Sequence, residues 1–452
     1  MTYHCVAAPP FSRLLACVGL SVWFCAASAQ QVPPATVHRV ALTGETRQFA
    51  SGCALACLPG SLVVVRFGED LREVLIGRVS LLGTAGGDRG QLPAVTAPAV
   101  RVGVRDVVLG TRGKGGTNHG MEDQDVCLFR DARLSADGEA LYVLVATKPA
   151  ALLLLRFDAI TGNVLFTTEL PPVAKDFWDG NAGILAVGES VLVGVDDGSL
   201  WSVDAITGDP GTPASLANDS SRAFEAEVLP VGRTICLSGD GIAAFARGAD
   251  VSGTWRPKWS HEWGDYGLVG DNATPRRSLS GRRFLRSVGS PPVVACVAYD
   301  QEWEQPMGGT AYLVWLGPED GSMVNERTAL GKGLLDSSVV TCGQRVFCSV
   351  GNRLSCLLAP SGAIQWTRRF VKQEHGLVRA YAPLGRHLLV ATERKVVCLR
   401  LDTGEPEGAI GDLPVLDQLH SSRLGSYVVG VPDKWGDSVF VFQPRTAGTG
   451  PP

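Results

Sequence analysis

The chain has 452 residues, 45% of them hydrophobic and 19% charged, with 54 glycines, 27 prolines and a formal net charge of −4. Low charge together with abundant glycine and proline is typical of many buried strands joined by tight turns. The small net charge excludes a general electrostatic reason for binding nucleic acid or an anionic membrane surface, so we expect neither as a partner.

Residues 1–29 have the pattern of a signal peptide. Arg13 supplies the basic residue, Leu14 to Phe24 forms an apolar core, and Ala27-Ser28-Ala29 forms a small-residue cleavage site. The core is shorter than the roughly 20 residues that span a bilayer. Most of it follows Cys17 rather than preceding it, which disfavours lipidation at this cysteine. We therefore expect export to the periplasm, the cell exterior or a secretory lumen, and a mature chain of 452 − 29 = 423 residues without a transmembrane span.

A polar, glycine-rich segment runs from 111 to 125 and has almost no apolar surface to bury, so we expect a loop there. His119, Glu122, Asp123 and Asp125 lie in it, and a hard cation such as Ca²⁺ accepts ligands of this kind. The spacing is not that of a loop that wraps an ion. We therefore expect a solvated connection and no metal site.

One strand-turn-strand unit recurs after this loop. Its turn is Asp158-Ala159-Ile160-Thr161-Gly162 and, 46 residues later, Asp204-Ala205-Ile206-Thr207-Gly208. The residues before each turn are mostly β-branched, aromatic or leucine, which suit a buried strand. Asp and Thr can hydrogen-bond the backbone ahead of them, and Gly accepts a positive φ without a steric clash.

Weaker copies place Trp366 four residues after Gly362, as Phe166 follows Gly162, and end another turn at Gly404. With two degenerate copies, the turn glycines fall at positions 162, 208, 253, 321, 362 and 404, at spacings of 46, 45, 68, 41 and 42 residues. A period of 41 to 46 residues holds the four short strands of a propeller blade, and the long interval indicates one blade with an insertion.

Further strand-like runs lie at 62–67, 74–82, 100–109, 140–146 and 438–442. Counting candidate last strands gives eight or nine blades, so we predict one all-β propeller of eight four-stranded antiparallel blades, with seven blades as the alternative. We expect the first and last strands to share one blade, because an open ring would leave sheet edges exposed.

The recurring turn, with an aromatic four residues after Gly162 and Gly362, resembles the repeat of the pyrroloquinoline-quinone-type (PQQ-like) β-propellers. The copy at Gly208 departs from the pattern, because Thr212 replaces the aromatic. The resemblance covers about residues 140 to 443 and implies the propeller fold. That superfamily includes quinoprotein dehydrogenases, the β-propeller lipoprotein of the outer-membrane protein assembly machinery, and luminal scaffold subunits in eukaryotes. Fold carries over more safely than activity.

The chain lacks several features of the enzymes in that superfamily. A quinone-dependent dehydrogenase would need a catalytic carboxylate, a metal-binding set and, in many members, adjacent cysteines packed against the cofactor. The chain contains no Cys-Cys pair and no Gly-x-Ser-x-Gly nucleophile elbow. We therefore expect no catalytic, cofactor-binding or metal-binding residues.

The cysteines number 12 − 3 = 9 after removal of the signal peptide. Cys356 and Cys398 each lie in an apolar run six residues before a turn glycine, so we expect them to be packing residues. Local disulfides stay open as alternatives: Cys53 with Cys57, and Cys342 with Cys348 or Cys356.

The long interval has the most distinctive composition in the chain. It contains Trp255, Trp259, Trp263, Arg276, Arg277, Arg282, Arg283 and Arg286. Trp and Arg are enriched at binding hot spots, so this insertion, about 255–290, is our candidate contact surface for a protein partner. The alternative is that the tryptophans pack between blades and the arginines solvate a loop.

The sequence thus predicts a signal peptide at 1–29, a propeller at 30–443 and a disordered tail at 444–452. We expect a non-enzymatic scaffold for proteins, present as a monomer or as a subunit of a larger complex. Two other functions stay open: a quinone- or metal-dependent oxidoreductase that uses the propeller channel, and a carbohydrate-binding propeller.

Overall fold

The fold is known from a computed structural model, in which Val32–Pro452 forms a compact unit. The described residues are 34–41, 53–67, 74–81, 100–111, 127–147, 151–170, 182–195, 198–215, 223–229, 233–238, 241–247, 255–268, 284–300, 309–332, 338–422, 425–432 and 438–445. The predicted signal peptide, the polar segment 112–125 and the tail after Arg445 lie outside these ranges.

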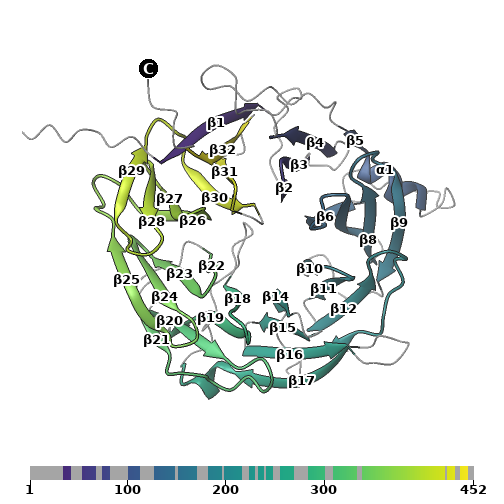
Figure 1. Ribbon diagram of the computed structural model, residues 1–452. Helices are drawn as coiled ribbons and strands as arrows, with labels where there is room; N and C mark the ends of the chain where they lie inside the picture. The colour runs from purple at the N-terminus through teal and green to yellow at the C-terminus, as the bar shows by residue number, and fades with distance from the viewer. Residues whose placement is uncertain are drawn as a thin grey trace, which may run out of the picture. The chain divides into compact units, whose positions relative to one another are not determined.

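Eight four-stranded antiparallel sheets form a ring, which confirms the predicted eight-bladed propeller (Figure 1). Blade 1 consists of β2 (Cys53–Leu58), β3 (Ser61–Phe67), β4 (Val74–Ser80) and β5 (Val100–Val102). Blade 2 consists of β6 (Cys127–Leu134), β7 (Ala140–Thr147), β8 (Ala151–Asp158) and β9 (Val164–Leu170). Blade 3 consists of β10 (Ala182–Val187), β11 (Ser190–Val195), β12 (Ser199–Asp204) and β13 (Ala214–Ser215). Blade 4 consists of β14 (Ala223–Leu229), β15 (Arg233–Ser238), β16 (Gly241–Arg247) and β17 (Trp255–Glu262).

Blade 5 consists of β18 (Leu285–Val288), β19 (Val293–Asp300), β20 (Thr310–Leu316) and β21 (Thr328–Lys332). Blade 6 consists of β22 (Val340–Cys342), β23 (Arg345–Val350), β24 (Arg353–Leu358) and β25 (Ala363–Arg369). Blade 7 is β26 (Val378–Leu384), β27 (His387–Thr392), β28 (Val396–Arg400) and β29 (Pro406–Ile410). Blade 8 is β30 (Leu416–Ser421), β31 (Val428–Pro432), β32 (Ser438–Pro444) and β1 (Ala35–Ala41).

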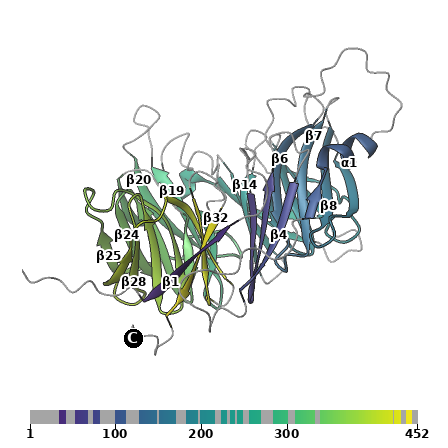
Figure 2. The same ribbon diagram turned by 90° about the horizontal axis from the view of Figure 1, so that it is seen from above.

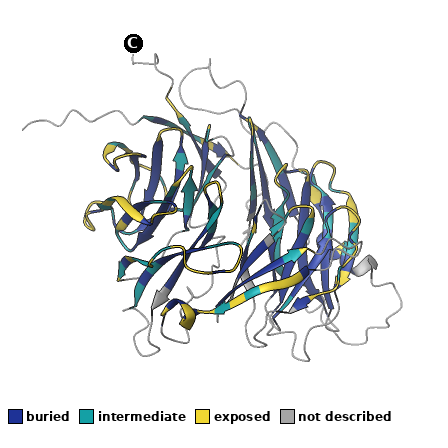
Figure 3. Ribbon diagram, turned by 60° about the horizontal axis from the view of Figure 1, so that its bottom comes forward, coloured by how far each residue is buried: buried dark blue, intermediate teal, exposed yellow. Residues whose placement is uncertain are grey.

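Burial follows the order of the strands in each blade. The first strand lies nearest the ring axis and the fourth lies at the periphery (Figure 1). The second and third strands carry nearly continuous apolar runs and are almost wholly buried, because a neighbouring blade covers each face of the sheet. Exposed residues concentrate in the fourth strands and their turns (Figure 3).

The ring closes through blade 8, as predicted. β1, from the start of the propeller, pairs antiparallel with β32, from its end, in a register that runs from Ala35 opposite Pro444 to Ala41 opposite Ser438. Across the junction with blade 1, the Tyr427 hydroxyl lies 2.6 Å and 2.7 Å from two blade 1 carbonyl oxygens and donates to them. The two ends of the propeller chain are therefore held in a single sheet.

The predicted turns connect the third and fourth strands. In the copy that ends at Gly208, the Asp204 carboxylate accepts hydrogen bonds from the backbone N–H groups of Ile206 and Thr207, both at 2.8 Å. Asp158 accepts the equivalent pair in blade 2 at the same distances. Gly208 has a φ of +81°, a conformation that glycine adopts without the steric cost borne by other residues.

Each of these turns is a docking point for the preceding blade. A Cβ atom added to Gly404, at the blade 7 turn, would lie 2.6 Å from the Trp366 ring of blade 6. The Trp366 indole N–H also donates to the backbone carbonyl of Leu401 at 3.2 Å. The aromatic residue that follows one turn therefore fills the space left by the missing side chain in the next turn.

The same docking recurs elsewhere in the ring. A Cβ atom at Gly208 would lie 2.7 Å from the Phe166 ring, and one at Gly321 would lie 2.7 Å from the Trp259 ring. The Trp259 indole N–H donates to the carbonyl of Pro318 at 3.3 Å, and Trp366 makes the equivalent bond to Leu401 two junctions later. The predicted aromatic spacing is thus a packing device that joins neighbouring blades.

A β-bulge directs these aromatics toward the neighbouring blade. In blade 2, Phe166 pairs with Arg156 and Val164 pairs with Phe157, so Leu165 is an extra residue in the fourth strand. The fourth strands of blades 4, 5, 6 and 7 carry equivalent bulges at Lys258, Leu330, Gln365 and Glu407. A bulge bends its strand and re-aims the side chains that follow.

The predicted strand at 100–109 is correct only up to Val102. The chain then forms α1 (Val104–Thr111) at the periphery of the ring (Figure 1, Figure 2). Val104, Val107 and Val108 recur at helical spacing, and the first and last of these are fully buried in the cluster shared by blades 1 and 2. Among the described residues, no helix is long and apolar enough to cross a membrane.

We expect Asp204→Ala to lower the free energy of unfolding by about 1 kcal/mol, because two backbone N–H groups lose their acceptor. Those bonds, from Thr207 first and Ile206 second, also lower the pKa of Asp204. The stabilisation is therefore present above the ordinary Asp pKa of about 4 and is lost as pH falls through the folded-state pKa. Urea unfolding at neutral pH and at about pH 3 measures both effects, and the deficit of the variant should shrink in acid.

The exposed Glu326 provides the control for this experiment, as Glu326→Ala. Two results would contradict the hydrogen bonds assigned to Asp204. One is a loss of unfolding free energy in Asp204→Ala that equals the loss in the control, and the other is a loss that stays constant between the two pH values.

Candidate functional site

The tryptophan- and arginine-rich segment belongs to two blades. Its first residues form the outer strand β17 and the 3-10 helix η2 (Trp263–Tyr266), and Arg286 lies in β18, the inner strand of blade 5. The predicted insertion therefore begins and ends within propeller strands, and its extra length lies in the connection between blades 4 and 5. Arg276, Arg277, Arg282 and Arg283 lie outside the described residues.

The three tryptophans of this segment pack against the propeller. The exposed fractions of Trp255 and Trp263 are 8% and 3%, so a partner does not reach these two rings. Trp259 is half-buried and docks at Gly321, as described for the blade junctions. The three rings therefore pack against the blades, as the alternative interpretation of this segment describes.

Arg286 and two glutamates link the inner strands of blades 4 and 5. The Arg286 guanidinium lies 3.4 Å from the Glu227 carboxylate of β14. Glu225, which is 5% exposed, accepts hydrogen bonds from the backbone N–H groups of Phe284 and Leu285 at 2.7 Å and 3.2 Å. Buried carboxylates are costly unless they are bonded in this way, so these groups hold one blade to the next.

Blades 2 and 3 are linked by the same means. Asp131 accepts a hydrogen bond from the backbone N–H of Ile184 at 2.8 Å, and Arg133 donates to the carbonyl of Leu185 at 3.0 Å. We did not single out these inner-strand carboxylates from the sequence. Charged residues that alternate with apolar ones, as in Glu225 to Glu227, have the pattern of a solvated strand face, and only the position of the next blade reveals their partners.

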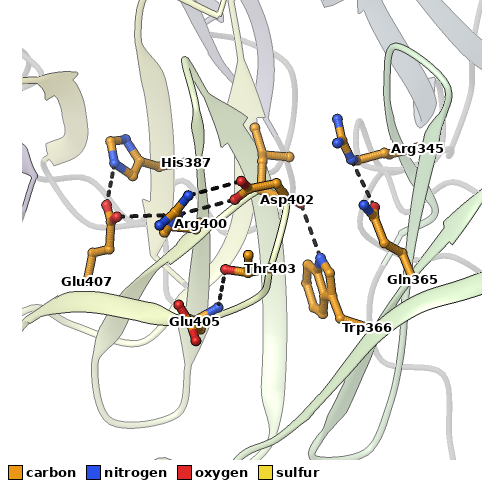
Figure 4. Close-up of polar contacts among 10 residues, drawn as sticks. Arg345, Gln365, Trp366, His387, Arg400, Asp402, Thr403, Glu405 and Glu407 are labelled. Carbon is orange, nitrogen blue, oxygen red and sulfur yellow. Dashed lines mark hydrogen bonds and ion pairs between the residues drawn. The ribbon is translucent and has the colours of Figure 1, made fainter.

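The outer half of blade 7 holds the polar network shown in Figure 4. His387 Nε2 lies 2.7 Å from a carboxylate oxygen of Glu407, and Arg400 lies between Glu407, at 3.7 Å, and Asp402, at 3.0 Å. A histidine–carboxylate pair can serve general acid–base chemistry when a nucleophile adjoins it. The thiol of Cys398, on the neighbouring strand β28, has its pKa raised to about 12 by burial, so it is protonated and a poor nucleophile. The network instead ties β27, β28 and β29 together.

Within the described ranges, no group of three His, Cys, Asp or Glu side chains is arranged to hold a metal ion. His119, Glu122, Asp123 and Asp125 lie in the part of the chain that is not described. The expectation for that segment therefore stays a prediction.

The cysteines whose side chains are described are free thiols. Cys57, Cys342, Cys348 and Cys356 are among them, so the structure forms none of the local disulfides left open by the sequence. Cys356 and Cys398 are fully buried in strands, which confirms their expected packing role. Burial raises the pKa of Cys356 to about 12, as it does for Cys57 and Cys236.

Exposed apolar side chains lie on the turn and outer strand of blade 2 and on the turn of blade 3. We call Ile160, Val164, Leu165 and Ile206 the apolar rim, and their exposed fractions are 55%, 41%, 48% and 77%. The Arg156 guanidinium of β8 donates to the carbonyl of Ile206 at 3.2 Å, and the Phe166 ring of β9 packs at Gly208, so both strands adjoin the blade 3 turn. Ile recurs at the third position of the repeated turn, and this recurrence is the sequence signal for the exposed apolar side chains.

The same positions carry different residues in other blades. Where blade 2 has Ile160, Val164 and Leu165, blade 6 has Pro360, Ile364 and Gln365, and blade 7 has Asp402, Pro406 and Glu407. The turn and the bulge are retained in all three blades, so the fold does not require apolar residues at these positions. Exposed apolar side chains that gather beyond what folding needs indicate an interaction site.

The buried thiols give a direct test of this arrangement. We expect Cys236, Cys356 and Cys398 to resist iodoacetamide in the native protein even at about pH 9, because the reactive thiolate is absent below the raised pKa. Unfolding in guanidinium should expose all three, and peptide mapping by mass spectrometry locates the modification. Rapid alkylation of any of the three without denaturant would contradict the packing.

Comparison with known proteins places the chain by fold. No family model and no curated protein matches the sequence. The solved structures similar to it include BamB from Moraxella catarrhalis, with a TM-score of 0.52, 12% identity, and coverage of 92% of this chain and 100% of BamB. The computationally designed Ika8 protein matches with a TM-score of 0.54, 13% identity, and coverage of 90% of this chain and 100% of Ika8. The likeness to these structures, together with the eight four-stranded sheets of the ring, shows that the chain has an eight-bladed β-propeller fold.

Proposed function

We propose that this chain is an exported, non-enzymatic propeller that acts as a scaffold for other proteins. The observation that carries the proposal is the apolar rim on the turn and outer strand of blade 2 and the turn of blade 3. Folding of the blades does not require four large apolar side chains to be exposed on these segments, and such patches mark protein contacts. The rigid blades beneath them hold the surface in a fixed shape.

The described polar groups support a structural role. Asp131, Glu225 and Glu227 accept backbone hydrogen bonds from a neighbouring blade, and His387 is paired within blade 7. Burial keeps the Cys398 thiol protonated. These groups are used to join strands and blades, and a scaffold requires nothing further of them.

Export rests on the sequence of residues 1–29, whose basic residue, apolar core and small-residue cleavage site support a signal peptide. The mature protein would then act in the periplasm, outside the cell or in a secretory lumen, as a monomer or as a subunit of a larger complex. We propose Arg276, Arg277, Arg282 and Arg283 as a second contact surface, on the strength of their composition.

Purification from the exported fraction without overexpression tests this function. We expect size-exclusion chromatography with light scattering to give a particle heavier than the mature chain alone, containing a second protein in fixed stoichiometry. We also expect no visible chromophore, and no dye reduction with alcohols or sugars after addition of quinone and Ca²⁺.

A stoichiometric chromophore with dye reduction would contradict the scaffold function and favour an oxidoreductase. A free monomer that retains full biological activity in a deletion-complementation assay would contradict it as well. In that case the protein would act without a stable partner.

A further inference from the structure

The strand beside the apolar rim is the free edge of its sheet. β9 is the last strand in the order β6-β7-β8-β9, and among the described strands it pairs with β8 on one edge and with no strand on the other. The N–H and C=O groups on the other edge of such a strand can pair with an added strand. Recognition of extended peptides by strand addition uses an edge of this kind, with side-chain contacts supplying the specificity.

The bulge places apolar side chains along this edge. In a regular strand, neighbouring side chains point to opposite faces, and one of two successive residues would be buried. Because Leu165 is the extra residue of the bulge, Val164 and Leu165 are both exposed. Ile206 continues the surface onto blade 3, next to the Arg156 contact. An extended segment along β9 would therefore meet apolar side chains over two blades.

The charges around the rim are mainly negative. Glu169 is exposed on β9 itself, Asp158 and Asp204 begin the two turns, and Asp209 is exposed just after the second turn. Backbone hydrogen bonds lower the pKa of Asp158 and Asp204, so both carboxylates are ionised at neutral pH. Arg156 and Arg247 supply positive charges to the same surface, since each lowers the pKa of one of the turn aspartates. Four carboxylates against two guanidinium groups favour a partner that carries basic residues.

We propose that β9 and the apolar rim bind an extended segment of a partner protein in which apolar residues alternate with lysine or arginine. The segment adds to the free edge of β9 as a fifth strand of blade 2. Its apolar side chains cover Val164, Leu165 and Ile206, and its basic side chains meet the surrounding carboxylates. This inference rests on the proposed scaffold function and names the surface and the partner chemistry for it.

The probe is a fluorescein-labelled peptide of about eight residues in which valine alternates with lysine, the length of an ordinary strand. Fluorescence polarisation with the purified mature protein should show saturable binding that weakens with added salt, because the carboxylates are exposed and screened. A peptide of equal length in which glutamate replaces lysine should bind at least about tenfold more weakly.

The double variant Leu165→Ser, Ile206→Ser should weaken binding of the valine–lysine peptide by about tenfold or more, because two apolar contacts are lost. Ile364→Ser is the matched control, since Ile364 is 50% exposed at the equivalent of Val164 in blade 6. It should leave the affinity unchanged. Equal losses in the two variants, equal affinities for the lysine and glutamate peptides, or no binding at all would overturn the assignment.

A second readout separates this inference from the scaffold function. If the native complex persists in the double variant while peptide binding is lost, the scaffold stands and its partner uses another surface. If the wild-type protein forms no complex, the proposed function fails, whatever the peptide does. If the complex forms with the wild-type protein and is lost in the double variant, the result supports both the scaffold function and the proposed binding surface.

Discussion

The docking of an aromatic ring against the turn glycine of the next blade is the constraint on which this propeller depends. Trp366 fills the space beside Gly404, and Phe166 fills the space beside Gly208. The glycines hold left-handed turns, and a side chain at either position would occupy the space that the ring needs. Because the ring comes from one blade and the glycine from the next, these contacts form only when the two blades lie side by side.

This constraint also explains the outer strands. The bulge in the fourth strand of blades 2, 4, 5, 6 and 7 re-aims that strand, and in each of these five blades it leaves one residue free of ladder pairing. In blade 7 this residue is Glu407, which pairs with His387, and in blade 2 it is the exposed Leu165. The residue at such a position can differ between blades, and the proposed contact surface uses the apolar residues that blade 2 has there.

Much of the architecture could be predicted from local chemistry. The residues from Asp204 to Gly208 supply the hydrogen bonds and the positive φ of the turn. The spacing at which this turn recurs along the chain matches the length of one blade. Ring closure followed from the cost of exposed edges, and β1 pairs with β32 accordingly. The wrong prediction concerns a segment whose structure depends on the blades that pack against it. Three of the five residues from Val104 to Val108 are β-branched valines, which favour a strand, and the helix that they form is stabilised by burial against blades 1 and 2.

The candidate site was less predictable for the same reason. Trp259 in a polar, arginine-rich segment has the composition of a binding residue, and only the position of Gly321 shows that it is a docking ring. Ile206 lies in the most regular part of the repeat, where an apolar residue suggests a core position. Its 77% exposure follows from the turn geometry, which directs it away from both blades.

A comparison of two glycine substitutions tests the docking constraint most directly. Gly404 and Gly343 have φ values of +70° and +60°, but a Cβ atom would meet Trp366 only at Gly404, and it would meet nothing within 4 Å at Gly343. Urea unfolding should show a loss of about 1 kcal/mol for Gly343→Ala, from backbone strain alone. Gly404→Ala should lose about 2 kcal/mol more, because the indole must move. Equal losses in the two variants would show that the ring and the turn do not hold the blades together.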